Sequence, residues 1–163
     1  MQLRTDPVSA IRAHHEELQT LLEDRVEAVI AAARAGRPNR LAVHELMALL
    51  THDIVPHARA EEDVLYAAGT TEPELRRLIE SMRFEHETLL ALTDELGSVS
   101  SGVDAAAIAR AIREVFVGHL RRENELLLPA LAANPRFGLA RMLPVMHETF
   151  VLYRAATHDE VAS

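Results

Sequence analysis

The sequence predicts an all-α protein, an antiparallel up-down-up-down four-helix bundle followed by a shorter C-terminal fifth helix. Three observations support this prediction. Alternating runs of β-branched residues, which are typical of strands, are missing. Residues that favour helix dominate the chain. Four long amphipathic segments follow one another with short connections, which favours antiparallel neighbours. With 163 residues, 48% of them hydrophobic, the chain is expected to form a single domain, 1–163.

The first two helices have clear start and stop signals. Asp6 is a capping residue followed by Pro7 at the first helical position, and this segment closes near Gly36. Asn39 can cap the second helix, which ends near Gly69.

Similar signals bound the third and fourth helices. Thr71 and Glu74 form a capping-box pattern, and the third helix ends at Gly97. A flexible turn follows, after which Asp104 can cap the fourth helix. The bundle is therefore expected to span about residues 7–132.

Two prolines stand inside predicted helices. Pro144 lies in the fifth segment, about residues 135–158, and is expected to break or kink it. Pro56 precedes His57 in the second helix. Two roles stay open for Pro56: bending the helix around a site, or marking a local kink.

Each long segment carries an apolar stripe at steps of three and four residues, which predicts the core face of a helix. The stripes comprise Val8, Ile11, Leu18, Leu22 and Val29; Val43, Met47, Leu50, Ile54, Val64 and Ala68; Leu75, Ile79, Met82, Leu89 or Leu90, and Leu96; and Ile108, Ile112, Val115, Leu126 and Ala130.

Polar residues interrupt all four stripes. Two segments, "HARAEEDVLY" at 57–66 and "HLRRENELLL" at 119–128, repeat a His-x-x-x-Glu pattern that places both side chains on one helical face. The other two stripes are each interrupted by a single His. The interrupting residues are His15, His57, Glu61, His86, His119 and Glu123.

These six residues are expected to meet in one layer of the bundle. A rise of roughly 1.5 Å per residue brings them to similar heights when they are measured from the connections. One interpretation is a set of structural core histidines with glutamate counter-ions. Burying unpaired charge costs on the order of several kcal/mol per ion, so metal binding is the favoured interpretation.

The remaining histidines are less suited to the site. His44 and His52 lie off the face of His57 and are expected to be solvated. His14 is one step from His15, so it can support the site from outside or compete as a ligand. His147 can cap the bundle, although a surface or packing role is favoured, and His158 lies near the fraying end.

The composition of the six-residue set limits the choice of metal. Imidazole and carboxylate without thiolate suit iron, manganese or zinc. Six ligands exceed the four of a structural zinc site. Two ions that share two bridging carboxylates fit this set better.

The sequence resembles the hemerythrin-like (HHE cation-binding) family over residues 7–132. The resemblance rests on six residues in four short stretches: His15 in "AHHEEL", His57 and Glu61 in "HARAEEDVLY", His86 in "EHETLL", and His119 and Glu123 in "HLRRENELLLP". It implies a non-haem centre of two iron ions, oxo- or hydroxo-bridged, with these six residues as metal ligands.

Two departures from the oxygen-carrying hemerythrins bear on function. Their third helix carries a second His where this chain has Leu90, and their fourth-helix carboxylate is an Asp five residues after His, where this chain has Glu123 at four. Loss of the extra His leaves an open position on both irons, which favours redox chemistry over oxygen carriage. The expected function is a reaction with hydrogen peroxide, nitric oxide or oxygen, and catalase-like breakdown of hydrogen peroxide in oxidative or nitrosative stress is favoured.

Two alternatives stay open. One is reversible binding or sensing of oxygen or nitric oxide without turnover, and the other is a metal-free helical interaction protein. The resemblance also implies iron–sulfur repair as a role of some relatives, but the cysteine-bearing segment of those proteins is absent, because the chain contains no cysteine.

Composition limits the partners and the compartment. The N-terminus lacks the apolar stretch of a signal peptide, and no run of 18 apolar residues exists. A net charge of -8 disfavours nucleic acid. We therefore expect a cytoplasmic protein that binds small diatomic molecules or peroxide, and neither nucleic acid nor membrane.

Overall fold

The computed structural model describes the backbone of residues 6–161 and the side chains of residues 6–157. Within that range the chain is helical and contains no strand, which confirms the all-α prediction. The helices are α1 (Pro7–Arg34), α2 (Arg40–Leu49), η1 (Leu50–Ile54), α3 (Val55–Glu61), η2 (Glu62–Tyr66), α4 (Ala67–Gly69), α5 (Pro73–Ser98), α6 (Gly102–Arg122), η3 (Glu123–Leu127), α7 (Leu128–Ala133) and α8 (Leu139–Val161), where η marks a π-helix.

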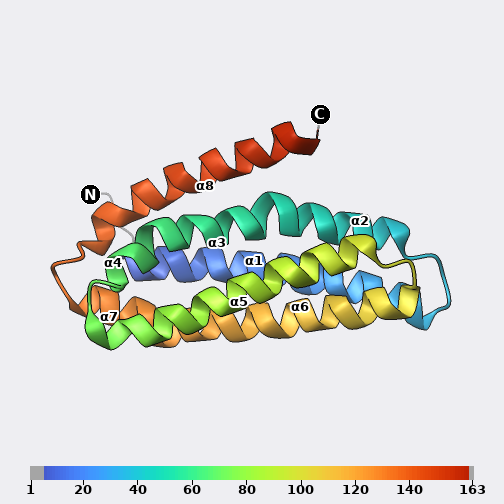
Figure 1. Ribbon diagram of the computed structural model, residues 1–163, viewed down its shortest axis with the longest axis horizontal. Helices are drawn as coiled ribbons and strands as arrows, with labels where there is room; N and C mark the ends of the chain where they lie inside the picture. Colours follow the sequence, from blue (N-terminus) through green and yellow to red (C-terminus); the bar gives the residue numbers. More distant parts are fainter. Residues whose placement is uncertain (1–5, 162–163) are drawn as a thin grey trace.

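The eleven helices form five long pieces (Figure 1). The helices from α2 to α4 follow one another without a break and make one rod, residues 40–69, called rod two here. The helices from α6 to α7 make another, residues 102–133, called rod four. In Figure 1, α1, rod two, α5 and rod four lie side by side, and each runs opposite to the one before it in the sequence. Helix α8 crosses the outer side of rod two.

The helix starts agree only partly with the predicted caps. Asp6 accepts a hydrogen bond from the backbone N–H of Ser9 at 3.1 Å, and Pro7 opens α1 as predicted. The predicted cap at Asp104 is wrong, because the Ser101 hydroxyl accepts from the Asp104 N–H and α6 begins at Gly102.

Two further caps differ from the prediction. The Thr71 hydroxyl donates to the backbone carbonyl of Ala68 instead of capping α5, which begins at Pro73. Asn39 stands at the start of α2, but its side chain donates to the carbonyl of Gly102 at 3.2 Å. That bond ties the start of α2 to the start of α6.

The π-helical turns change which residues face the core. A π-helix bonds each N–H to the carbonyl five residues back, so one extra residue is placed in the turn. Leu65 and Leu127 are therefore fully buried, whereas Leu126, predicted for the core from an α-helical period, is 52% exposed. The prediction failed there because η3 shifts the helical face by one residue.

The prolines behave differently from one another. Pro56 follows η1 by two residues and Pro129 follows η3 by two residues, and both rods continue through them. Proline clashes with the carbonyl four residues back, and the wider π-turn relieves that contact. Of the two outcomes predicted at Pro144, a break is wrong, because α8 is one continuous helix, and a kink stays a prediction. Near a helix start, proline removes only one backbone hydrogen bond.

The apolar core is divided into two clusters. One contains Leu22, Leu46 and Ile112 and fills the end of the bundle near the α1–α2 turn. The other contains Ile79 and Leu127 and fills the opposite end, where α8 begins. Leu89 belongs to the first cluster, which settles the choice between Leu89 and Leu90 in favour of Leu89.

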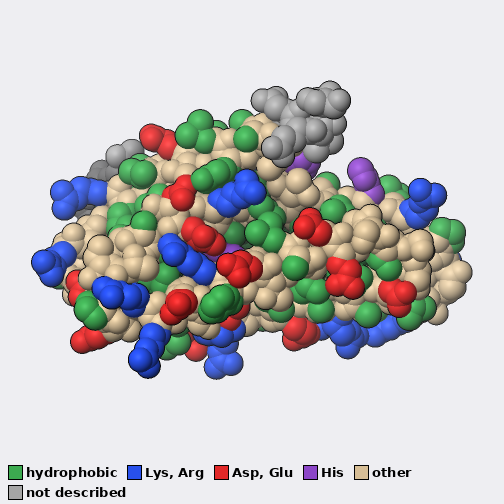
Figure 2. All heavy atoms as spheres, in the orientation of Figure 1, with side chains coloured by type: hydrophobic (Ala, Val, Ile, Leu, Met, Phe, Trp, Pro, Cys, Tyr) green, Lys and Arg blue, Asp and Glu red, His purple; other side chains and the backbone are tan. Residues whose placement is uncertain are grey.

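Polar side chains hold α8 on rod two. The Tyr153 hydroxyl donates to the Asp63 carboxylate at 2.6 Å, and the Arg154 guanidinium pairs with Asp53 at 3.2 Å. On the molecular face in Figure 2, acidic and basic side chains are interspersed. Among residues 6–161, no helix is long and apolar enough to cross a membrane.

Candidate metal centre

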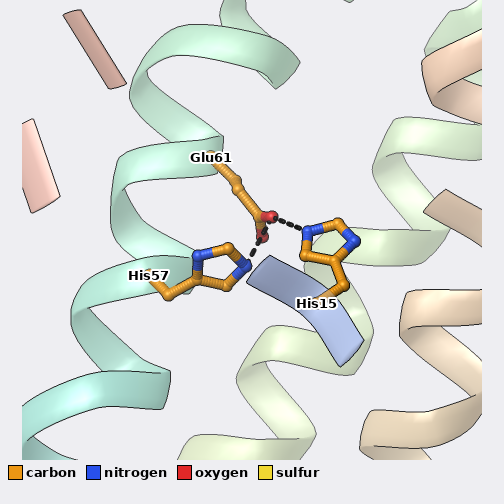
Figure 3. A group of neighbouring side chains, drawn as sticks. All are labelled: His15, His57 and Glu61. Carbon is orange, nitrogen blue, oxygen red and sulfur yellow. Dashed lines mark hydrogen bonds and ion pairs between the residues drawn. The ribbon is translucent and has the colours of Figure 1, made fainter. Parts of the chain in front are cut away.

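The layer between the two apolar clusters contains the six predicted residues. Helix α1 supplies His15 and rod two supplies His57 and Glu61. One carboxylate oxygen of Glu61 lies 3.2 Å from Nε2 of His15 and 2.7 Å from Nε2 of His57. Figure 3 shows this carboxylate between the two imidazole rings. These three residues form one half of the centre.

The other half is built by α5 and rod four. Nε2 of His86 lies 3.1 Å from Nε2 of His119 and 3.8 Å from the second oxygen of Glu61. Glu123 lies between the halves, because one of its oxygens is 3.6 Å from Nε2 of His15 and 3.7 Å from Nε2 of His119. The structure therefore brings all six residues together.

Several carboxylate oxygens in this layer have no hydrogen-bond partner. Glu61 and Glu123 are fully buried. One oxygen of Glu61 and both oxygens of Glu123 are buried without a hydrogen bond. Buried acceptors are normally satisfied, and each one left without a partner costs about 1–3 kcal/mol. A cation bound among these oxygens would remove that cost.

Outer residues orient the imidazoles. His15 Nδ1 is 2.8 Å from the Asn124 side-chain oxygen, His86 Nδ1 is 2.7 Å from Glu62, and His119 Nδ1 is 3.0 Å from Glu85. Each ring that donates its Nδ1–H outward keeps a lone pair on Nε2, which faces the layer. This is the arrangement by which proteins orient metal-binding histidines.

The two central glutamates titrate in opposite directions. Burial acts to raise the pKa of Glu61, but the neighbouring His57 and His15 hold it well below its usual value. Burial and the charge of Glu61 raise the pKa of Glu123 well above its usual value. Without a cation, ionisation of one of these two neighbouring carboxyl groups therefore disfavours ionisation of the other. A cation would favour ionisation of both.

Tyr66 is a buried member of the centre that the sequence analysis did not predict. Its ring stacks on His86 with centroids 5.5 Å apart and planes 10° apart, and its hydroxyl lies 3.3 Å from Nε2 of His119. Burial, followed by the charges of Glu123 and Glu61, raises the pKa of Tyr66 well above its usual value. The phenol therefore keeps its proton. A Tyr five residues after Glu61, at the end of the π-helix η2, has no signal in an α-helical period.

The two halves of the chain contribute corresponding residues. Glu62 follows Glu61 and binds the His of α5, just as Asn124 follows Glu123 and binds the His of α1. The residue after each central glutamate thus orients the single His of the other half. Glu62 and Asn124 stand at the same position of the two repeated decapeptides, but their common role becomes evident only from their hydrogen bonds to His86 and His15.

The correspondence breaks down at two positions. Glu85 precedes His86 and accepts from His119, and it also pairs with Arg122. His14 precedes His15 in the same way, but it places its ring edge-on to His57 with centroids 5.0 Å apart.

The second difference concerns the residue that stands five positions after each central glutamate. Tyr66 stands five residues after Glu61, whereas Leu128 stands five residues after Glu123. The two halves of the centre are therefore chemically different.

The other histidines lie outside the six-residue layer. His14 is half-buried, and burial, with His57 and His15, lowers its pKa. His44 and His147 are exposed. The prediction of a solvated His52 is wrong, because its Nδ1 lies 3.2 Å from the Thr157 hydroxyl of α8. The side chain of His158 lies outside the described residues.

The donor atoms fit metal binding. Two groups, each with ligand atoms within 4.8 Å of one another, consist of His15, His57 and Glu61, and of Glu61, His86 and His119. Glu61 belongs to both groups, and it offers one oxygen toward each. Neutral imidazole and carboxylate are ligands that suit iron, manganese and zinc. These residues could therefore hold a metal ion, and Glu61 is shared by both groups.

Comparison with known proteins agrees with this chemistry. The family model described as "Hemerythrin HHE cation binding domain" matches residues 6–136, which confirms the resemblance inferred from the sequence. The match ends before α8 begins. Comparison with curated proteins and with solved structures gave no match.

Proposed function

Because the chain belongs to the hemerythrin HHE cation-binding family, we propose that its six-residue cluster holds two iron ions and that the protein breaks down hydrogen peroxide in a catalase-like reaction. The observation that carries the proposal is the position of Glu61, which is shared by two groups of potential ligands. One group offers His15 and His57 to one ion, and the other offers His86 and His119 to the second.

Two bound iron ions would supply the two-electron redox change that converts two molecules of hydrogen peroxide into two of water and one of oxygen. The chain positions and protects this chemistry. Glu61 and Glu123 would hold the ions together, and burial of the layer keeps bulk water away. Asn124, Glu62 and Glu85 fix the imidazole rings from outside.

Tyr66 adds a proton donor on one side of the centre. Its pKa is raised, so its hydroxyl stays protonated at neutral pH and can donate a hydrogen bond to an oxygen that binds near His119. No imidazole comes from position 90, where the oxygen-carrying relatives have one. Both halves would therefore retain an open position, which supports turnover of peroxide over simple carriage.

The alternative is reversible binding of oxygen or nitric oxide for storage or sensing. The apolar surroundings of His57 favour it, because uncharged diatomic molecules enter such surroundings readily. In either case we place the protein in the cytoplasm, in the response to oxidative or nitrosative stress, with small oxygen or nitrogen species as its ligands.

Metal analysis and oxygen measurement test the proposal together. Protein purified from iron-replete cells is expected to contain two irons per chain, with near-ultraviolet charge-transfer bands, and to release oxygen from hydrogen peroxide. The variant Glu61→Gln/Glu123→Gln is the control and is expected to lose iron and oxygen release together. A tightly bound single zinc would contradict the two-iron assignment. Iron without oxygen release, but with a spectrum that changes reversibly on removal of oxygen, would favour the alternative.

A further inference from the structure

A cavity of about 530 Å³ opens between α1, α3 and α8 beside the metal centre. His57 forms part of its wall, so the cavity reaches one of the six clustered residues directly. Helix α8 supplies Leu143, His147 and Phe150 to the opposite side. The roof of the cavity therefore lies outside residues 6–136, the part that matches the family.

The size of the cavity exceeds what peroxide or a diatomic molecule needs. Sites for small organic ligands usually enclose about 300–1,000 Å³, whereas one water molecule takes up about 30 Å³ of liquid. A ligand with several carbon atoms would fill the cavity better than hydrogen peroxide does. The volume thus points to a larger molecule than the one in the proposed reaction.

The wall of the cavity is apolar and uncharged at every described position except for its histidines. Aliphatic side chains such as Leu143 and Ala10 dominate it, and the described lining includes no Asp, Glu, Lys or Arg. Two of its imidazole rings lie close together, because the His14 ring is 5.0 Å from that of His57 and 6.0 Å from that of Phe150, whereas His147 lines the α8 side. Such a wall suits a ligand with an apolar body and one polar head.

The location of the cavity follows from the difference between the halves of the centre. On the α5 side, Tyr66 covers the imidazole of His86 and Glu85 binds that of His119. At the corresponding corner of the first half, His14 replaces that acidic residue and the cavity opens instead. Access to the centre is therefore expected at His57.

We propose that this cavity binds an uncharged, mainly apolar organic molecule with a single polar head, such as an alcohol or a hydroperoxide, with the head directed toward His14 and His57. Helix α8 closes over the apolar body, and its bonds to rod two keep the roof in place. An anion of similar size is disfavoured, because the described wall contains no cationic side chain to offset the loss of its hydration.

Titration calorimetry with 2-phenyl-2-propanol, an uncharged aryl alcohol, tests the proposal on the full chain as purified and again after metal removal. Saturable binding of one molecule per chain is expected in both forms, and benzoate is expected to bind at least about tenfold more weakly. Because binding is also measured without metal, a failure of the proposed peroxide reaction leaves this result intact. Absence of saturable binding in both forms, or equal binding of benzoate, would overturn the proposal.

Two variants locate the binding site. Ala10→Trp places a large ring at the cavity wall and is expected to weaken binding of the alcohol by about tenfold or more. Ala91→Trp places the same ring on the exposed face of α5 and is expected to change binding by no more than about twofold. If Ala10→Trp does not fold, Leu143→Asp takes its place as the cavity variant, because it puts a charge in the cavity wall from the α8 side.

The outcomes of these variants decide between occupants. Unchanged binding in both folded cavity variants would show that the alcohol binds elsewhere, and the proposal would be wrong. It would also be wrong if the wild-type protein dimerised through this face, which would appear as a concentration-dependent mass in sedimentation that Ala10→Trp abolishes.

Discussion

The hydroxyl of Tyr66 and Nε2 of His119 lie 3.3 Å apart inside the bundle, and neither residue lines the cavity at His57. The Tyr66 ring also stacks on His86. One half of the centre is thus covered by a protonated phenol, while the other half meets an apolar cavity. This difference separates a proton-donating side from an access side.

Removing the phenol hydroxyl tests the role of Tyr66. Tyr66→Phe keeps the ring on His86, so iron content is expected to stay the same while oxygen release from peroxide slows by about tenfold or more, because a positioned proton donor is lost. Oxygen-electrode rates normalised to bound iron measure the effect. Thr20→Val, which loses a hydroxyl hydrogen bond to the Glu16 carbonyl on the exposed side of α1, is the control. Equal rates in Tyr66→Phe and wild type would show that the hydroxyl takes no part in turnover.

Stability of the metal-free protein is expected to depend on Glu123. The pKa of Glu123 is raised in the folded state from a usual value of 4.5, so above that pH the folded protein holds a proton that the unfolded chain releases. This contribution to stability is complete below pH 4.5 and is lost as pH rises toward the raised pKa. A glutamine at this position does not ionise, so the protein does not lose this stability as pH rises. Glu123→Gln should therefore stabilise the metal-free protein at neutral pH, by about 1–4 kcal/mol.

Chemical denaturation from pH 4 to pH 8, followed by circular dichroism in the presence of a chelator, measures this difference. It is expected to be smallest at the acid end and to grow with pH. Glu148→Gln, on the exposed side of α8, should show no such trend. A gain for Glu123→Gln that does not vary with pH would contradict the raised pKa.

The outer carboxylates should control metal affinity. Glu62→Ala removes the acceptor for Nδ1 of His86 and is expected to weaken metal binding by about 10- to 100-fold, which competition with a chelator measures. Glu87→Ala, an exposed change on α5, should leave the affinity unchanged. Equal losses in both variants would indicate a general charge effect and not orientation of the ring.

A substitution at position 90 tests whether an open position on both ions is needed for turnover of peroxide. Leu90 is 39% exposed and shares a small cavity with His86 and Glu62, whereas its neighbour Leu89 lies in the core. Leu90→His is therefore expected to change stability by only about 0.5 kcal/mol. An imidazole there would add a ligand beside His86, slow peroxide turnover per iron and prolong the lifetime of an azide adduct.

Leu90→Gln controls for polarity at the same position. Crystallography of the metal-bound Leu90→His protein shows whether the new ring reaches the metal. If it does and turnover per iron is unchanged, an open position on both ions does not distinguish the enzyme from a carrier.

The helical class and the six clustered residues could be predicted from the amino-acid sequence. An apolar stripe of period 3.6 fixes a helical face, and His or Glu in that stripe must be buried wherever the stripe is buried. His15 and His86 could thus be assigned to the same layer from spacing alone. The start of α1 at Asp6 was also predictable, because a side-chain cap acts within three residues.

Only the tertiary structure decided the register beyond Glu61 and Glu123 and the surroundings of the imidazoles. The π-turn η3 moves Leu127 inward and Leu126 outward, and the α-helical period from which the core stripes were predicted contains no such wider turn. The contacts of Tyr66 with His119 and of Glu85 with Arg122 depend on how separate helices rotate against each other. The cavity depends on where α8 crosses rod two. Helical period acts over a few residues, whereas these features arise from packing between segments far apart in the chain.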